Sequence, residues 1–205
     1  MTNKVMIATK NKGKASEFAT LFSQFGLEVS TLLDIENHPD IEETGNTFEE
    51  NARIKAETLS LELNEMVLAD DSGLIVDELD GAPGIYSARY AGVEKNDEAN
   101  IDKLLYEMRD VPENKRTARF SAVLLCPCPL AIPGEETIFV SGKCEGKILT
   151  ERHGVNGFGY DPIFFASEVG KSMAELTNKE KNKISHRSEA LKNLEPILRD
   201  LFIQK

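Results

Sequence analysis

The segment that most constrains the fold is VLADDSGL, residues 67–74, in which an apolar stretch runs directly into two aspartates. Val67–Ala69 is typical of a short buried strand. Asp70, Asp71 and Ser72 then place two carboxylates and a hydroxyl at its carboxyl end, where Gly73 permits a sharp bend. Two adjacent carboxylates can be buried away from water only when a cation compensates their negative charge. Mg²⁺, held by one or two carboxylates and by phosphate oxygens, is such a cation; an exposed turn is the structural alternative.

Length and composition indicate a globular chain. Its 205 residues, 40% hydrophobic and 29% charged, suffice for one large domain or two lobes with a shared core. No apolar run approaches a membrane span, and Val5–Ala8 is too short for a signal-peptide core, so we expect a cytoplasmic protein without a membrane partner. The net charge of −11 disfavours an extended nucleic-acid surface but leaves room for a small phosphorylated ligand.

Apolar spacing predicts alternating strands and helices, with capping boxes at Thr47 and Thr177. The expected strands are Lys4–Thr9, Leu27–Leu32, Met66–Ala69, Leu74–Val76, a hairpin of Thr117–Cys126 and Thr137–Cys144, and Lys147–Thr150. The expected helices are Ala15–Phe25, one starting at Thr47, Asp97–Met108 and an amphipathic C-terminal helix kinked or divided at Pro196. This order predicts an α/β core with a mixed sheet and an attached β-rich lobe.

The connection after the first strand has the features of an anion site. A strand that leads into a helix N-terminus directs unpaired N–H groups and the positive end of the dipole at one point. The glycine allows close approach, and three lysines add local positive charge, although the spacing is not that of a P-loop. A solvated basic turn capped by the asparagine is the alternative. The candidate phosphate-binding residues are Thr9, Lys10, Asn11, Lys12, Gly13 and Lys14.

Two further segments next to glycines carry candidate site residues. Glu42-Glu43, before Thr44-Gly45, could supply a metal ligand facing Asp70-Asp71 or simply favour a helix dipole. The run Gly157–Pro162 resembles a platform on which a flat ring can stack, with an aspartate to orient a sugar hydroxyl or a base edge; a tight turn with aromatic anchors is the alternative. The platform residues are Phe158, Gly159, Tyr160 and Asp161.

The last candidate set lies near the C-terminal helices. Lys181 and the triplet Ser185-His186-Arg187 offer several donors suited to purine oxygens and phosphate. No serine-nucleophile motif surrounds Ser185, which argues against a hydrolase triad and leaves a helix N-cap as its simplest role.

Together these segments resemble the Ham1-type family of inosine/xanthosine triphosphate pyrophosphatases. The resemblance spans nearly the whole chain in the family order, although Lys10 stands where such proteins often have glycine or proline. The matching segments are TKNKGK (9–14), EETGNTFEENA (42–52), ADDSGL (69–74), GAPGIYSARYAG (81–92), GFGYDPIF (157–164) and ISHRSEAL (184–191).

The resemblance implies an ITPase-like (Ham1/Maf-like) α/β fold, with a long mixed β-sheet and two α/β lobes around a central cleft, in one domain over residues 1–205. It also implies a homodimer that hydrolyses ITP, dITP or XTP to the monophosphate and pyrophosphate with Mg²⁺. In that scheme Asp71 is the catalytic base and a metal ligand, and Glu42 is the second metal contact. Ser72, residues 9–14 and Lys181 hold the nucleotide, and Phe158–Asp161 with His186 and Arg187 receive the base.

Two other function classes stay open at this point. A haloacid-dehalogenase-like phosphatase would place its two aspartates two positions apart, whereas Ser72 stands two after Asp70. A nucleotide-sensing module would bind without turnover, which only an assay distinguishes.

Overall fold

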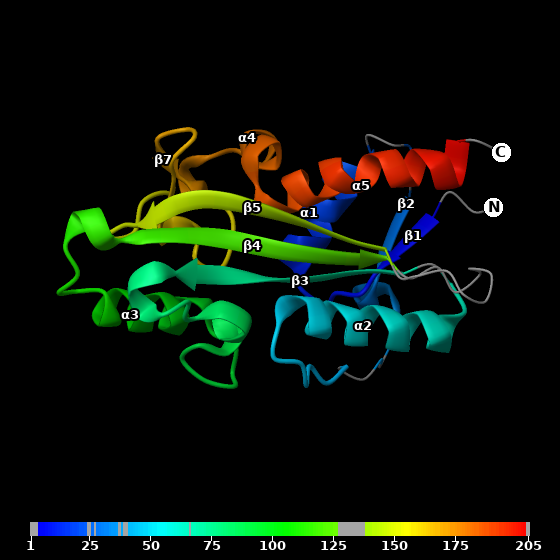
Figure 1. The fold of residues 1–205 in the computed structure, drawn as a ribbon, viewed down its shortest axis with the longest axis horizontal. Helices are drawn as coiled ribbons and strands as arrows, with labels where there is room; N and C mark the ends of the chain where they lie inside the picture. Colours follow the sequence, from blue (N-terminus) through cyan, green and yellow to red (C-terminus); the bar gives the residue numbers. More distant parts are fainter. Residues whose placement is uncertain are drawn as a thin grey trace. The chain divides into compact units, whose positions relative to one another are not determined.

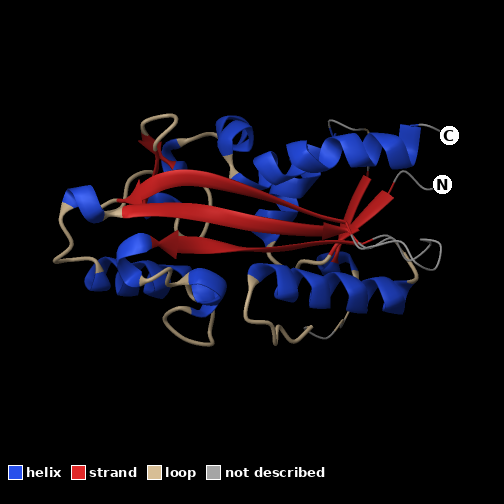
Figure 2. Cartoon of the chain, in the orientation of Figure 1, coloured by secondary structure: helices blue, strands red, loops and turns tan. Residues whose placement is uncertain are grey.

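The computed structural model describes residues 4–23, 26, 28–36, 38, 41–65, 67–126 and 138–203 (Figures 1 and 2). Its strands are β1 (Lys4–Ile7), β2 (Glu28–Thr31), β3 (Val67–Val76), β4 (Thr117–Cys126), β5 (Ile138–Ile148), β6 (Phe164–Ala166) and β7 (Lys171–Ser172). Its helices are α1 (Lys12–Ser23), α2 (Phe48–Leu63), α3 (Asp97–Glu107), α4 (Asn178–Ile184) and α5 (His186–Ile203).

The seven strands form one sheet in the order β2-β1-β3-β4-β5-β6-β7. β1 pairs in parallel with β2 and with β3, whereas β6 pairs antiparallel with β5 and with β7. The predicted α/β fold with a mixed sheet is therefore confirmed. Among the described residues, no helix is long and apolar enough to cross a membrane.

Several element boundaries differ from the sequence predictions. The strands expected at Met66–Ala69 and Leu74–Val76 are one continuous strand, β3, so Asp70 and Asp71 lie inside it and the prediction of a strand end was wrong. Of the strand expected at Lys147–Thr150, Lys147 and Ile148 form the end of β5, and Leu149 and Thr150 lie outside it. Helix α5 is not divided at Pro196, which lies inside it. Phe25, Leu27, Met66 and the hairpin tip 127–137 lie outside the described residues.

The helix starts follow the predicted caps. The Thr47 side chain accepts a hydrogen bond from the Glu50 N–H, while the Glu50 carboxylate accepts one from the Asn46 N–H. Thr177 and Glu180 form the complete reciprocal box at the start of α4. These caps fix the starts of α2 and α4, and α4 carries the candidate site residue Lys181.

The chain divides into two compact units. Unit 1 comprises residues 1–71, 122–142 and 190–205, and unit 2 comprises residues 72–121 and 143–189. Strands β3, β4 and β5 and helix α5 each contribute residues to both units. The boundary within β3 falls between Asp71 and Ser72, so two candidate site residues joined by a peptide bond belong to different units.

Unit 1 is a sheet covered by helices on both faces (Figure 1). Val5, Ile7 and Leu68 pack with Phe18 of α1 and with the part of α5 that contains Leu191. The alternate residues of the same strands face the other way, and that cluster, packed with α2, contains Met6, Ala8, Val67, Ala69, Ala52, Ala56 and Leu59. Because side chains alternate along a strand, Asp70 continues the face of Leu68 and Asp71 continues the face of Ala69.

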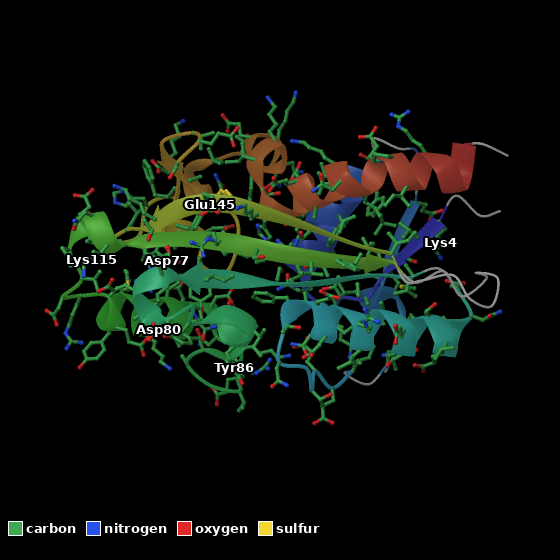
Figure 3. The ribbon with its side chains drawn as sticks, in the orientation of Figure 1. Lys4, Asp77, Asp80, Tyr86, Lys115 and Glu145 are labelled. Carbon is green, nitrogen blue, oxygen red and sulfur yellow. The ribbon has the colours of Figure 1, made fainter. Side chains whose placement is uncertain are left out.

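Unit 2 has its own apolar core. Leu74 and Val76 of β3 pack with Ile101 and Leu104 of α3 and with Phe164 of β6. On its surface, Arg119 of β4 forms ion pairs at 2.8 Å with Asp77 and at 3.2 Å with Glu145, both labelled in Figure 3. This exposed network links β4 and β5 to the turn after β3.

Candidate functional site

The two central aspartates of β3 have different cationic partners. The Asp70 carboxylate is fully buried, and its Oδ2 lies 2.9 Å from Nζ of Lys14 on α1. The Asp71 carboxylate is one-tenth exposed, and its Oδ1 accepts a hydrogen bond of 3.0 Å from Nζ of Lys55 on α2. The compensating cations are thus lysines, one for each carboxylate and for each face of the sheet, and the pair does not form a two-carboxylate metal site.

Lys55 is a site residue that the sequence analysis did not identify. Its Nζ also donates to the Asp70 carbonyl oxygen at 3.0 Å and lies 3.3 Å from Glu43 Oε1. The available signal was a lysine within the apolar stripe of α2, between Ala52 and Leu59, where a cation stays buried only beside negative groups.

The structure distinguishes between the two neighbouring glutamates. Glu43 pairs with Lys55 and so belongs to the network of Asp71, whereas Glu42 is exposed. Among the described residues, no three His, Cys, Asp or Glu side chains converge as a ready-made metal site. The role of Glu42 as a metal ligand stays a prediction.

Burial controls the electrostatics of Asp71. Loss of water raises the pKa of Asp71, although Lys55 and Lys14 act in the opposite direction. Burial alone would lower the pKa of Lys55, but Asp71 and Glu43 outweigh it and the pKa of Lys55 is raised. Lys55 therefore stays charged, and Asp71 is a stronger proton acceptor than an ordinary aspartate.

Asp71 keeps one oxygen available for chemistry. Oδ1 is held by Lys55, and among the described residues no hydrogen-bond partner reaches the buried Oδ2. A buried carboxylate oxygen without a donor is costly in a purely structural role. It suits an atom that receives a proton or binds a cation during a reaction.

The segment between β1 and α1 combines helix capping with basic side chains. The Asn11 side chain accepts a hydrogen bond from the Lys14 N–H at 3.0 Å, and Thr9 Oγ1 accepts one from the Asn11 N–H at 3.1 Å. Lys10 donates to the His38 carbonyl oxygen at 2.5 Å. The predicted cap is therefore confirmed, and Thr9, Lys10, Asn11, Lys12, Gly13 and Lys14 all lie in unit 1 with Asp70 and Asp71.

In unit 2, Asp161 organises the glycine-rich loop. Its Oδ2 accepts hydrogen bonds from the Phe158 N–H at 2.9 Å and from Lys181 Nζ at 2.6 Å. Gly157 has φ +78°, and a Cβ there would lie 2.0 Å from the same Oδ2, so only glycine fits beside this carboxylate. Asp161 thus orders a loop and a lysine, a use that the sequence analysis did not foresee.

The two aromatic rings of this loop have different environments. Phe158 is half-buried, and Lys181 Nζ and Arg187 Cζ lie 4.5 Å and 5.6 Å from its ring centroid. The Tyr160 ring is buried, and its hydroxyl donates to the Ser87 carbonyl oxygen at 2.9 Å. Phe158 is therefore the ring that could stack on a ligand, and Tyr160 anchors the loop.

The start of α5 presents the remaining candidates. Ser185 caps the helix by accepting a hydrogen bond from the Ser188 N–H at 3.1 Å, as the N-cap interpretation predicts. The His186 ring stacks on Phe120 with the centroids 5.1 Å apart. Arg187 donates to Ser72 Oγ at 2.7 Å, so unit 2 brings together Ser72, Phe158, Asp161, Lys181, His186 and Arg187, with Gly159 held by Asp97.

The chain is similar to known proteins over almost its full length. The Ham1 family profile matches residues 5–197. A dITP/XTP pyrophosphatase of Bacillus cereus is 54% identical over 97% of this chain and 96% of its own. The Ham1 protein of Staphylococcus aureus superposes with a TM-score of 0.82 at 43% identity, over 96% of this chain and 98% of that one. A nucleoside-triphosphatase / dITP/XTP pyrophosphatase of Mycobacterium abscessus superposes with a TM-score of 0.73 at 38% identity, over 94% and 99%.

The order of motifs, the mixed sheet and these similarities over almost the full length agree with one another. The chain belongs to the Ham1 family.

Proposed function

We propose that this protein hydrolyses non-canonical purine nucleoside triphosphates (ITP, dITP and XTP) to the monophosphate and pyrophosphate, and so clears them from the nucleotide pool. Its similarity to proteins named dITP/XTP pyrophosphatase supports the reaction class. The structural observation that carries the proposal is the buried Asp71 carboxylate, held through one oxygen by Lys55 while the other oxygen has no described hydrogen-bond partner.

The chemistry assigned to unit 1 is attack of water on the α-phosphorus. Asp71 Oδ2, which has no described hydrogen-bond partner, accepts the proton of the attacking water. Lys14 and the N–H groups at the start of α1 stabilise the negative charge on the triphosphate and on the departing pyrophosphate, with Lys10 and Lys12 as further cations. The reaction breaks the bond between the α-phosphorus and the bridging oxygen, which leaves with the β- and γ-phosphates.

Asp71 is compatible with a bound Mg²⁺. Mg²⁺ binds one or two protein carboxylates and completes its shell with water and phosphate oxygens. The Asp71 carboxylate and the glutamate segment, which lies near it through the Glu43–Lys55 ion pair, would be a suitable donor set. We assign Asp71 and Glu42 as its ligands, with Glu43 paired to Lys55. When bound, the ion would neutralise phosphate charge and lower the pKa of a coordinated water.

We assign the purine to unit 2. Phe158 offers a face for stacking, and His186 and Arg187 offer donors to O6, which hypoxanthine and xanthine carry where adenine has an amino group. A site built around donors rejects a base that cannot accept from them. Asp161 holds Lys181 against Phe158, and Ser72 orients Arg187. Gly159 and Tyr160 shape the loop.

A homodimeric state, implied by the family resemblance, and a cytoplasmic location, expected from the sequence, complete the proposal. Light scattering of the purified protein, which weighs 22.7 kDa per chain, would give the mass of a dimer. A monomer mass at micromolar concentration would contradict the dimer and leave the hydrolytic function as proposed.

The deciding experiment is pyrophosphate release from ITP, dITP, XTP, ATP and GTP at equal concentration, with Mg²⁺ and with EDTA. We expect IMP and pyrophosphate from ITP, no IDP, little product from ATP and loss of activity in EDTA. IDP as the first product would instead indicate a phosphatase, and binding of ITP without turnover would indicate a sensing module.

A further inference from the structure

The direction of the Phe158 ring depends on the two peptide groups that flank this residue. On one side, the Phe158 N–H donates to Asp161 Oδ2 at 2.9 Å. On the other side, the Phe158 carbonyl oxygen accepts from the Asp161 N–H at 3.3 Å, and the Gly159 N–H donates to Asp97 Oδ2 at 2.9 Å. Because a peptide group is planar, these bonds set φ and ψ of Phe158 and with them the direction of its side chain.

Asp97 reaches this loop from a distant part of the chain. It lies in the first turn of α3, 62 residues before Gly159. Gly159 has φ +58°, and a Cβ built on it would have no atom within 4 Å, so packing on that side does not hold its backbone. Glycine adopts positive and negative φ about equally. An acceptor on a helix therefore selects the conformation in which the Gly159 N–H points to α3.

Helix α3 supports this acceptor without depending on it. The Asn96 side chain caps the helix by accepting a hydrogen bond from the Ala99 N–H at 3.0 Å. Ile101 and Leu104 of α3 are buried in the core of unit 2. Asp97 itself is exposed, so removal of its carboxylate should leave the helix in place.

We propose that Asp97 is a positioning residue for the purine, which holds the Gly159 N–H and so fixes the direction of the Phe158 ring. This role rests on the proposed function, in which Phe158 stacks on the base. Asp97 acts through the loop and not through a contact with the nucleotide. A ring that is already oriented binds without a further cost of ordering, so loss of Asp97 should weaken binding and spare the chemical step at Asp71.

The first test compares Asp97→Ala with Asp97→Asn. We expect Asp97→Ala to raise KM for ITP about fivefold, the scale of one hydrogen bond, while kcat stays within about twofold of wild type. The dissociation constant of IMP, measured by calorimetry, should rise by the same factor. Asparagine loses the charge but keeps an oxygen that can accept from the Gly159 N–H, so Asp97→Asn should restore most of the affinity.

The comparison also tests an effect of the helix dipole. An acidic residue in the first turn stabilises a helix through its charge, which alanine and asparagine both remove. Equal rises in KM for Asp97→Ala and Asp97→Asn would therefore assign the effect to charge at the start of α3 and would overturn the proposal.

The matched control is Glu98→Gln. Glu98 shares the first turn of α3, and its carboxylate pairs at 3.0 Å with Arg152, which precedes the loop of residues 157–161. Arg152 keeps its 2.7 Å ion pair with Asp102 in this variant. We expect KM for ITP within about twofold of wild type. A rise equal to that of Asp97→Ala would contradict a specific role of Asp97.

The second test is a double-mutant cycle with Phe158→Ala. If Asp97 acts through the ring, Asp97→Ala should raise KM by less than about twofold when the ring is already absent. The same fivefold rise in both backgrounds would mean that Asp97 acts independently of Phe158, and the proposal would be wrong.

A structural role alone predicts a different result. It would lower the unfolding temperature and kcat of Asp97→Ala while KM and IMP binding stay at wild-type values, and that outcome would also overturn the proposal. Failure of the proposed function is distinct, because the wild-type protein itself would then release no pyrophosphate from ITP, dITP or XTP. Calorimetric binding of IMP still tests Asp97 in that case, since it does not depend on turnover.

Discussion

Neighbouring residues in β3 have separate chemical environments because a strand directs successive side chains to opposite faces. Asp70 meets Lys14 of α1, and Asp71 meets Lys55 of α2. A different lysine therefore lies beside each of the two carboxylates. Asp71 combines a raised pKa with an oxygen that lacks a described hydrogen-bond partner.

This difference predicts unequal effects of the same substitution. Asp71→Asn removes the proton acceptor, so we expect kcat to fall about 100- to 10,000-fold while the protein stays folded. Asp70→Asn removes the negative charge that pairs with Lys14, so we expect a smaller fall in kcat and a larger rise in KM. Steady-state kinetics with ITP, with circular dichroism to verify folding, measures both. A folded Asp71→Asn variant with near-normal turnover would remove Asp71 from the mechanism.

Substitutions in the two units should distinguish base recognition from phosphate binding. Arg187→Ala removes donors from the proposed base set, so we expect the preference for ITP over ATP to fall by about 1–3 kcal/mol. Lys14→Ala should weaken ITP and ATP about equally, because both carry the same triphosphate. The measurement is the ratio of kcat/KM for the two nucleotides.

Ser72→Ala is the matched control for Arg187, because it removes the 2.7 Å hydrogen bond and leaves the guanidinium. We expect a smaller change of selectivity in the same direction. If Arg187→Ala lowers kcat/KM for both nucleotides by the same factor, Arg187 belongs to phosphate binding or to the fold.

At the scale of elements, α4 depends on its cap. It has only seven residues, yet it carries Lys181, which pairs with Asp161 at 2.6 Å. Short helices gain little from propensity, so the reciprocal hydrogen bonds of Thr177 and Glu180 should determine where α4 begins. Hydrogen bonds from Thr177 lower the pKa of Glu180, so its part of the cap is present at neutral pH and is lost as pH falls below the usual glutamate range.

Thr177→Ala should therefore lower the free energy of unfolding by about 1 kcal/mol, the usual value of an N-cap. It should also raise KM for ITP more than it lowers kcat, since it loosens the helix that places Lys181. Urea unfolding and steady-state kinetics measure the two effects. Thr177→Ser, which keeps the hydroxyl, should leave both near the wild-type values.

The errors in the predicted elements have a common cause. Asp, Ser and Gly favour turns, so residues 70–73 and Gly146 of β5 were interpreted as breaks between strands. In β3 the lysines of α1 and α2 compensate the carboxylates, and the strand continues. In β5 a Cβ at Gly146 would lie 2.2 Å from the Phe165 carbonyl oxygen, so close packing of β6 requires glycine there. Both reasons are contacts in the tertiary structure, which the local sequence does not reveal.

At the scale of the molecule, neither unit is a continuous stretch of chain. The core of unit 1 includes residues of β4, β5 and α5, and three strands and α5 contribute to both units. We therefore expect one cooperative unfolding transition, which would support the prediction of a single domain with two lobes over residues 1–205.

The tyrosines allow the unfolding of unit 2 to be followed by intrinsic fluorescence, without an added fluorophore. The chain has four tyrosines and no tryptophan, and Tyr86, Tyr90, Tyr106 and Tyr160 all belong to unit 2. Tyrosine fluorescence thus follows unit 2, and far-UV circular dichroism follows the whole chain. Coincident urea transitions are expected, and separated midpoints would mean that the units unfold independently.

Sequence motifs identified the candidate segments but not their pairings. The caps at Asn11, Thr47, Thr177 and Ser185 follow from local chemistry, and the structure contains them. Lys55 and Phe120 were missed because their partners, Asp71 and His186, lie 16 and 66 residues away in the sequence. Which lysine meets which aspartate depends on helix placement, and spacing along the chain does not encode it.

The alternation along β3 also limits where this chain can change in length. Deleting one residue before Asp70 would move Asp71 to the side of Lys14 and turn Ser72 toward α2. Deleting two would restore the faces but shift every side chain by about 6.6 Å along the strand. Insertions and deletions among relatives should therefore be absent between residues 67 and 73 and collect in connections such as 92–96, where the backbone is exposed.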